Sequence, residues 1–246
     1  MIEKSITETN RFGLFAIIPI IGKREVSAFW KMRGISLLGL VIDMALLVHQ
    51  IERIVLVTNG SMTFEERAEH PRIHLLEIEN SERASDLTYS PSSILPQVVK
   101  RLEEISTQKM CCNGLVILDP LCPLRQLVHI QNAIELYESQ FKEPRPWLSV
   151  KSVNLVPNHY HPKKVLMLTQ EGDLDYYDPT GQMIYRRQQL KGDDFYCINQ
   201  AVHIVDPLSL EAKSFEHEEM LGLIIDDPMI TIERKEDLDL AKALGL

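Results

Sequence analysis

The sequence is poor in the features that mark zinc-binding, secreted and membrane proteins. Its 246 residues include 4 cysteines, none spaced as C-x-x-C and none accompanied by clustered histidines, which argues against a zinc site and for reduced thiols. No apolar run reaches the roughly 18–20 residues that span a bilayer. Residues 1–12 are polar and lack the apolar stretch of a secretory signal. The sequence therefore predicts a cytoplasmic protein that does not insert into a membrane.

Positive charge is also scarce. The chain has 26 Lys and Arg against 35 Asp and Glu, a net charge of −9, whereas nucleic-acid binding needs clustered cations. The Gly-x-Ser-x-Gly, Walker and dinucleotide-binding motifs are absent, which disfavours hydrolase, P-loop and nicotinamide-dependent classes. A small anionic substrate remains compatible with this composition, because a few local cations can outweigh the overall charge.

Short apolar runs alternate with helical segments over the first 150 residues. The runs predict buried strands at residues 14–20, 54–58, 74–78 and 115–118. The segments with helical character cover residues 36–50, 63–70, 91–105 and 127–141. Such alternation predicts an α/β, Rossmann-like fold, with a mainly parallel sheet, helices on both faces and ligands at the carboxyl ends of the strands.

The second half of the chain differs in composition. Residues 152–190 are rich in turn residues and short strands, and we expect them to form a β-rich excursion inserted into a single domain spanning residues 1–246. A helix is predicted over residues 235–244. The excursion carries apolar side chains, among them Leu166 and Tyr176, that a monomer would leave facing water. A homodimer joined through the excursion would bury them.

Seven segments carry a more specific signal, in the order 17–24, 34–38, 56–59, 83–88, 118–125, 186–199 and 230–238. The fifth reads Leu-Asp-Pro-Leu-Cys-Pro-Leu-Arg and is similar to a Leu-Gln-Pro-Thr-Ser-Pro-Leu-Arg motif. The sixth contains Arg-Arg-Gln-Gln-Leu and then Asn199, similar to Arg-Arg-Gln-Asp-Leu followed by Asn-Gly-Ala. Together the segments resemble the CMP-sialic acid synthetase family and its relatives, which activate acidic sugars with CTP.

The resemblance implies a nucleotide-diphospho-sugar transferase type of fold and an Mg²⁺-dependent reaction that joins a sugar hydroxyl to the α-phosphate of CTP. Lys23 and Arg24 would be the catalytic cations. The implied nucleotide-binding residues are Gly22, Lys23, Asn59 and Ser85. The implied sugar-binding residues are Asp119, Arg186, Arg187, Gln188 and Asn199. Glu233 would be a metal ligand, and His161-Pro162 resembles the dipeptide that opens the dimerisation arm of the family.

Elementary chemistry supports some of these roles and opposes others. Guanidinium groups bind carboxylates and phosphates with two hydrogen bonds, which suits Arg186 and Arg187 to anion recognition. Asp119 follows a buried strand at the expected ligand edge, where its charge would repel a sugar carboxylate. Glu233 provides the oxygen ligands that Mg²⁺ prefers, but an exposed carboxylate before a helix is an equal reading.

The sequence also departs from the family pattern. The phosphate loop is shorter and lacks its glycine pair, Ile35 stands where the family has lysine, and Thr231 and Glu233 stand where the family has two aspartates. Two hypotheses therefore stay open. The chain is either a cytidylyltransferase acting on an acidic, nonulosonate-type sugar, or a catalytically degenerate relative that acts as a binding or regulatory module.

Overall fold

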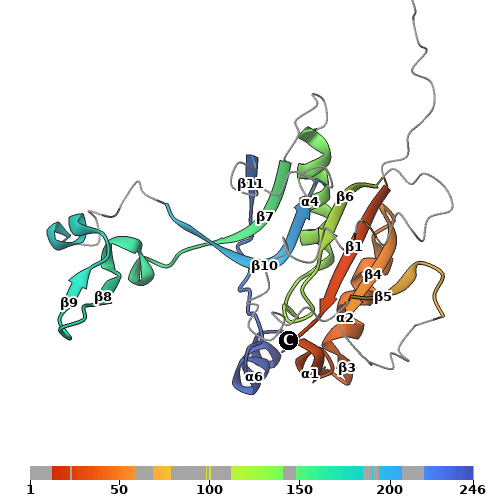
Figure 1. Ribbon diagram of the computed structural model, residues 1–246, viewed down its shortest axis with the longest axis horizontal. Coiled ribbons are helices and arrows are strands. Elements are labelled where there is room, and N and C mark those ends of the chain that lie inside the picture. The colour runs from red at the N-terminus through yellow and green to blue at the C-terminus, as the bar shows by residue number, and fades with distance from the viewer. Residues whose placement is uncertain are drawn as a thin grey trace, which may run out of the picture.

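A seven-stranded, mostly parallel sheet forms the centre of the molecule (Figure 1). The computed structural model describes residues 13–22, 24–58, 69–78, 98, 100, 112–140, 148–184, 190, 194–206 and 219–245. The strands, in their order across the sheet, are β11 (Glu219–Ile224), β7 (Leu148–Leu155), β10 (Tyr196–Val205), β6 (Cys112–Ile117), β1 (Gly13–Ile20), β4 (Ile51–Thr58) and β5 (Ile73–Glu77). Only β10 runs antiparallel to its two neighbours. The predicted α/β fold class is confirmed.

Strand β1 lies inside the sheet between β6 and β4 and is buried along its whole length. Its side chains alternate between two clusters, since successive residues of a strand face opposite sides. Leu14, Ala16 and Ile18 pack with helices α2 (Leu37–Leu47) and α4 (Leu127–Ser139) on one face. Phe15 and Ile17 pack on the other face in a cluster that includes Val98, which is helical. Burial on both faces explains why the run of residues 14–20 is continuously apolar.

The segment between β1 and β4 leads the chain from the sheet into α2. A four-residue helix, α1 (Arg24–Ser27), is followed by the hairpin β2 (Lys31–Met32) and β3 (Ile35–Ser36). Arg33 and Gly34 form its two-residue turn with φ of 53° and 82°, the backbone that a type I′ turn requires. The Ser36 hydroxyl then accepts a hydrogen bond from the Gly39 N–H at 2.8 Å and caps α2.

The predicted elements are confirmed where they were strongly periodic or continuously apolar. Strands β1, β4, β5 and β6 and helices α2 and α4 overlap their predicted ranges. The predicted helix at 63–70 lies outside the described residues, and so does most of 91–105, of which residues 98 and 100 are helical. Strands β7 and β11 were not predicted, because neither forms a continuous apolar run. β7 also places the beginning of the predicted excursion, residues 152–155, within the main sheet.

An arm projects from the sheet where β7 ends and β10 begins (Figure 1). It contains the antiparallel pair β8 (Leu166–Leu168) and β9 (Leu174–Tyr176) and three short 3₁₀ helices, η2 (Asn158–Tyr160), η3 (Pro162–Lys164) and η4 (Pro179–Met183). η4 packs against η3 so closely that a side chain on Gly181 would collide with the Lys163 carbonyl. All three residues of β8 are exposed.

The chain returns to the body of the protein in helix α6 (Lys235–Leu244), which matches the predicted helix at 235–244. The Asp237 carboxylate accepts the backbone N–H groups of Glu233 at 3.0 Å and Arg234 at 2.8 Å, and these bonds lower the pKa of Asp237. Leu238 and Ala241 pack with Met32 and Ile232 in a third apolar cluster. Within the described ranges, no helix is long and apolar enough to cross a membrane.

Candidate functional site

The candidate site lies at the carboxyl edge of the sheet, where several connections meet. β1 ends at Ile20 and enters a turn at Gly22, whose φ of 63° suits glycine and whose α-carbon has open space around it. β6 ends at Ile117 and leads through the loop 118–126 into α4. Parallel strands that neighbour each other bring these loops together, which is the usual position of ligand sites in such sheets.

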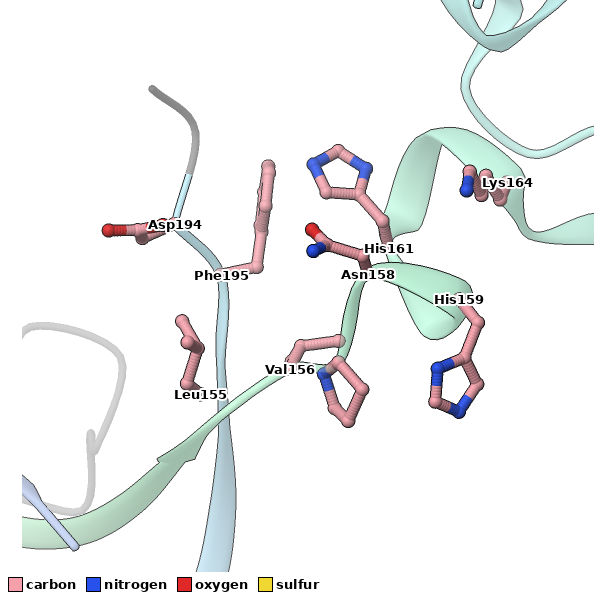
Figure 2. Close-up of a pocket in the computed structure, with 9 residues that line it drawn as sticks. Leu155, Val156, Asn158, His159, His161, Lys164, Asp194 and Phe195 are labelled. Carbon is pink, nitrogen blue, oxygen red and sulfur yellow. The ribbon is translucent and has the colours of Figure 1, made fainter. Parts of the chain in front are cut away.

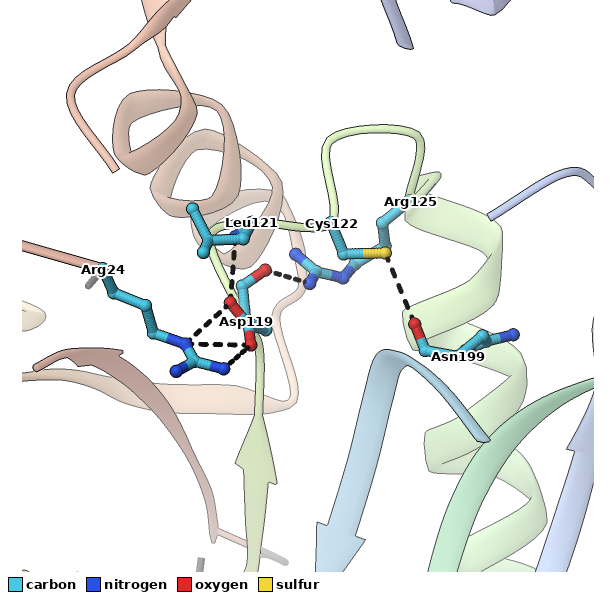
Figure 3. Close-up of polar contacts among 6 residues, drawn as sticks. All are labelled: Arg24, Asp119, Leu121, Cys122, Arg125 and Asn199. Atoms are coloured by element: carbon cyan, nitrogen blue, oxygen red, sulfur yellow. Dashed lines mark hydrogen bonds and ion pairs between the residues drawn. The ribbon is translucent and has the colours of Figure 1, made fainter. Parts of the chain in front are cut away.

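An ion pair joins the two loops (Figure 3). The Arg24 guanidinium donates to the Asp119 carboxylate from Nη2 at 2.8 Å and from Nε at 3.1 and 3.3 Å. The side chains are 16% and 3% exposed, respectively. Asp119 Oδ1 also accepts the Leu121 N–H at 2.9 Å, so the carboxylate both pairs with Arg24 and shapes its own loop. The Arg24 cation is therefore held at the sheet edge.

A second guanidinium, that of Arg125, is buried behind this pair (Figure 3). It donates from Nη2 to the Asp119 carbonyl at 2.5 Å and from Nε to the Ala201 carbonyl. Burial lowers the pKa of Arg125, although the nearby Cys122 and Asp119 oppose the shift, and an arginine stays charged in proteins. Among the described residues its buried Nη1 has no hydrogen-bond partner. Arg125 thus clamps the Asp119 loop to β10 and adds positive charge behind it.

The cysteine in the same loop is inert. Cys122 is buried and its Sγ donates to the Asn199 carbonyl at 3.8 Å (Figure 3). Burial raises the pKa of Cys122 to about 11, with Arg125 acting in the opposite direction. A thiol with this pKa stays protonated at neutral pH and is not a nucleophile.

A large bulge in β10 faces the loop. The register between β10 and β7 shifts between Ile198, which pairs with Val153, and His203, which pairs with Lys151, so residues 199–202 stand opposite Ser152 alone. Gln200 in this bulge has a φ of 58°. That left-handed conformation costs an L-residue about 1–2 kcal/mol.

Side chains from β7 hold the bulge in place. Asn199 Oδ1 accepts hydrogen bonds from the Ser152 hydroxyl at 2.5 Å and from the Ala201 N–H at 3.0 Å. Its amide group donates to Asn154 Oδ1 at 2.7 Å. Ser152 in turn accepts the Val202 N–H at 2.8 Å. The Asn199 side chain is therefore engaged on both its oxygen and its nitrogen.

Another polar group stands at the start of α4. His129 Nδ1 accepts the Gln126 N–H at 3.1 Å, which places the ring proton on Nε2, and Nε2 lies 3.0 Å from Asp227 Oδ2. Gln126 Nε2 donates to the same carboxylate oxygen at 3.1 Å. These contacts tie the segment after β11 to the carboxyl edge.

The structure describes five of the predicted site residues. Gly22, Arg24, Asp119 and Asn199 lie at the carboxyl edge, and Arg24 and Asp119 are in direct contact. Glu233 is exposed, and it follows Ile232, whose N–H donates to the Leu121 carbonyl at 2.8 Å. The remaining predicted residues, Lys23, Asn59, Ser85, Arg186, Arg187 and Gln188, lie outside the described residues.

Three side chains at this edge were not predicted as site residues. Arg125 lies in the motif-like segment 118–125, so its position after a buried strand was a usable signal. The importance of His129 and Asp227 depends on contacts between segments 98 residues apart, which the sequence does not display.

The described carboxylates do not build a metal site by themselves. No group of three or more His, Cys, Asp or Glu side chains gathers in the described part of the chain. Magnesium, however, is commonly held by one or two carboxylates together with substrate phosphates. Asp119 and Glu233 come from segments that touch through Ile232 and Leu121, but the Asp119 carboxylate is buried against Arg24, so of the two only the exposed Glu233 is open to a cation that arrives with a polyphosphate.

A separate hollow of about 410 Å³ lies at the base of the arm (Figure 2). Its lining residues come from the end of β7, from η2 and η3, and from Asp194 and Phe195 before β10. The His161 ring meets the Phe195 ring edge-on, with 4.7 Å between the centroids, and His161 Nδ1 accepts the Lys163 N–H at 3.1 Å. These contacts brace the two chain segments that carry the arm. Of the predicted site residues that the structure describes, none lines this hollow.

No protein-family model matches the sequence. Solved structures nevertheless share the fold over nearly the whole chain. A CMP:2-keto-3-deoxy-manno-octonic acid synthetase complexed with CTP superposes with a TM-score of 0.61 at 11% identity, covering 94% of this chain and 98% of that chain. The 4-diphosphocytidyl-2C-methyl-D-erythritol synthase of Anaerococcus prevotii has a TM-score of 0.58 at 14% identity, and the match covers 95% of this chain and 97% of that chain.

The 2-C-methyl-D-erythritol 4-phosphate cytidylyltransferase of Francisella tularensis gives a TM-score of 0.56 at 14% identity, covering 94% of this chain and 99% of that chain. Sequence identities this low establish the fold alone. The chain therefore has the α/β fold that these cytidylyltransferase structures share.

Proposed function

We propose that the chain is a cytidylyltransferase, which binds CTP at the carboxyl edge of the sheet and transfers its CMP group to the hydroxyl of an acidic sugar. The observation that carries this proposal is the meeting of the Gly22 turn, Arg24 and the Asp119 loop at that edge. The fold is shared with enzymes named for cytidylyl transfer, and one of them was solved with CTP.

The reaction needs little covalent chemistry from the protein. The acceptor hydroxyl attacks the α-phosphorus of CTP and pyrophosphate leaves, so positioning and charge stabilisation account for most of the catalysis. The open backbone at Gly22 lets phosphate oxygens approach, and Lys23 and Arg24, the next two residues in the chain, are the proposed cations. Glu233, which is exposed, would hold Mg²⁺ together with the substrate phosphates, and the cation would supply positive charge for the leaving pyrophosphate.

The Arg24–Asp119 pair makes an acidic acceptor compatible with the site. An unpaired aspartate at this position would repel a sugar carboxylate, but the pairing with Arg24 offsets its charge, and Arg125 adds a buried positive charge behind the loop. Arg186, Arg187 and Gln188 are the proposed contacts for the sugar carboxylate, on the strength of the motif they resemble.

We also propose that the arm joins two copies of the chain. Leu166, Leu168, Leu174 and Tyr177 on the arm are between 45% and 71% exposed, which is unusual for a patch of large apolar side chains. A second copy related by a two-fold axis would cover the same patch on both chains.

A binding or regulatory module without catalysis is the second candidate function. It is favoured by one observation, that Arg24 is already paired with a carboxylate instead of being open to phosphates. Such a module would bind CTP or a CMP-sugar and would not turn it over.

Pyrophosphate release separates the two candidates. The purified protein would be incubated with CTP, Mg²⁺ and a panel of acidic sugars that includes nonulosonates, with ATP, GTP and UTP as controls. The enzyme proposal expects pyrophosphate release that requires CTP and one of the sugars. Binding of CTP without release in any combination would favour the module instead.

A further inference from the structure

Gln200, in the bulge of β10, is a residue that the stability of the fold does not explain. Gln200 is exposed and its φ of 58° lies in the region that glycine adopts freely and other residues rarely adopt. Within the part of the chain that the structure describes, its side-chain amide makes no hydrogen bond. Glycine at this position would relieve the strain without losing an internal contact.

The surrounding contacts force the strained backbone. The carbonyls on either side of Gln200 are bound from the Asp119 loop, since Cys122 donates to the Asn199 carbonyl and Arg125 donates to the Ala201 carbonyl. The N–H of Ala201 is bound to the Asn199 side chain. Gln200 is thus the exposed residue between two backbone positions that are fixed to the site.

Strained residues held in place by their surroundings are concentrated at ligand-binding positions, where the strain serves the placement of a side chain. We propose that Gln200 is a specificity-determining residue that hydrogen-bonds the hydroxyl groups of the acceptor sugar. The proposal rests on the cytidylyltransferase function above and adds a contact to it.

The chemistry of the side chain specifies the ligand class. A primary amide offers two N–H donors and a carbonyl acceptor, which matches hydroxyl groups, because each hydroxyl both donates and accepts. It carries no charge for a carboxylate or phosphate. Gln200 would therefore hydrogen-bond the hydroxyl groups of the acceptor, while the acidic group and the nucleotide phosphates bind to arginine and lysine.

The test compares Gln200→Gly with the parent protein. Relief of the strained backbone should raise the melting temperature by about 2–4 °C. The affinity for CTP should not change. The value of kcat/KM for the acceptor should fall about tenfold, mainly through KM, as expected for the loss of one or two hydrogen bonds.

Gln200→Asn is the matched variant, since asparagine keeps the amide and tolerates a positive φ. It should retain more of the acceptor kcat/KM than the glycine variant does. A glycine variant with unchanged acceptor kinetics, or with a lowered melting temperature, would overturn the inference and leave the proposed function standing. A parent protein that releases no pyrophosphate with any acceptor would overturn both.

Discussion

At the residue scale, the Arg24–Asp119 pair organises the candidate site. Asp119 is almost completely buried, and it faces a cation that is largely buried as well. Removing one partner would leave the other charge poorly compensated, whereas removing both would be tolerated better. The pair therefore couples the loop after β1 to the loop after β6.

A double-mutant cycle measures this coupling. Arg24→Gln and Asp119→Asn should each lower the free energy of unfolding, and the double variant should be more stable than the sum predicts, by about 1–2 kcal/mol. The asparagine side chain that Asp119→Asn introduces can still accept the Leu121 N–H, so the cycle isolates the charge interaction. Urea denaturation of the four proteins gives the values. A coupling energy indistinguishable from zero would show that the two loops are not joined by this pair.

The sequence predicted part of this residue-scale organisation. Arg24 and Asp119 were both predicted as site residues from the family resemblance, and each was expected just past a buried strand; the pairing of β1 with β6 brings them to the same edge. Their direct pairing was not predicted. The hydrogen bonds by which Arg125 joins the Asp119 loop to β10 and the positive φ of Gln200 were not predicted either. Each of these depends on long-range contacts or on a dihedral angle that no local pattern encodes.

At the element scale, β10 connects the site to the rest of the sheet. It runs antiparallel between β6 and β7, it bulges at the carboxyl edge, and beyond the bulge it places His203 between Ile117 and Lys151. Burial, together with the charge of Lys151, lowers the pKa of His203 from 6.5 to about 3. The folded protein therefore holds this imidazole neutral.

The stability of the protein should consequently fall in acid. Between pH 6.5 and 3 the unfolded chain binds a proton at His203 that the folded chain does not, so the free energy of unfolding rises with pH across this window and decreases as pH falls through it. The slope from this one group approaches about 1.4 kcal/mol per pH unit. Urea denaturation between pH 7.5 and 4.5 measures it.

His203→Gln removes the titrating group and should lower the pH dependence of the free energy of unfolding by up to about 1.4 kcal/mol per pH unit. His49→Gln, at an exposed position, is the control and should leave the slope as it is in the parent. If the two variants show the same pH dependence as the parent, His203 is not held neutral by the fold.

The elements differ in how well the sequence predicted them, for physical reasons. β1 is buried on both faces and α6 carries a regular apolar stripe with acidic residues in its first turn, so both were predicted closely. β11 alternates exposed and half-buried residues in only one short run at the sheet edge. β7 mixes serine, lysine and asparagine with its apolar residues, because Ser152 and Asn154 bind the bulge of β10.

At the scale of the whole molecule, the arm is the proposed route to assembly. The arm with β8 and β9 extends away from the sheet (Figure 1). Its Leu166, Leu168 and Leu174 side chains are exposed. The excursion was predicted from its turn residues, but where it leaves the sheet was not, because β7 continues through Leu155.

The dimer proposal predicts that the arm controls association. Sedimentation at micromolar concentration should show a dimer for the parent and a monomer for Leu168→Asp, since a charge in an apolar interface is left without a partner. Leu240→Asp is the matched control, because Leu240 is also exposed but lies on α6. A monomeric parent, or a Leu168→Asp variant that remains dimeric, would contradict the assignment of the arm.

The edge formed by Gly22, Arg24 and Asp119 is the proposed binding site for CTP. Calorimetric titration of CTP into the parent, Arg24→Gln and Asp119→Asn tests it most directly, because the two variants should move the affinity in opposite directions. Loss of the Arg24 cation should weaken binding by about tenfold or more, whereas loss of the Asp119 charge releases Arg24 and, without Mg²⁺, should strengthen it. A parent that does not bind CTP, or equal affinities in all three proteins, would contradict the account.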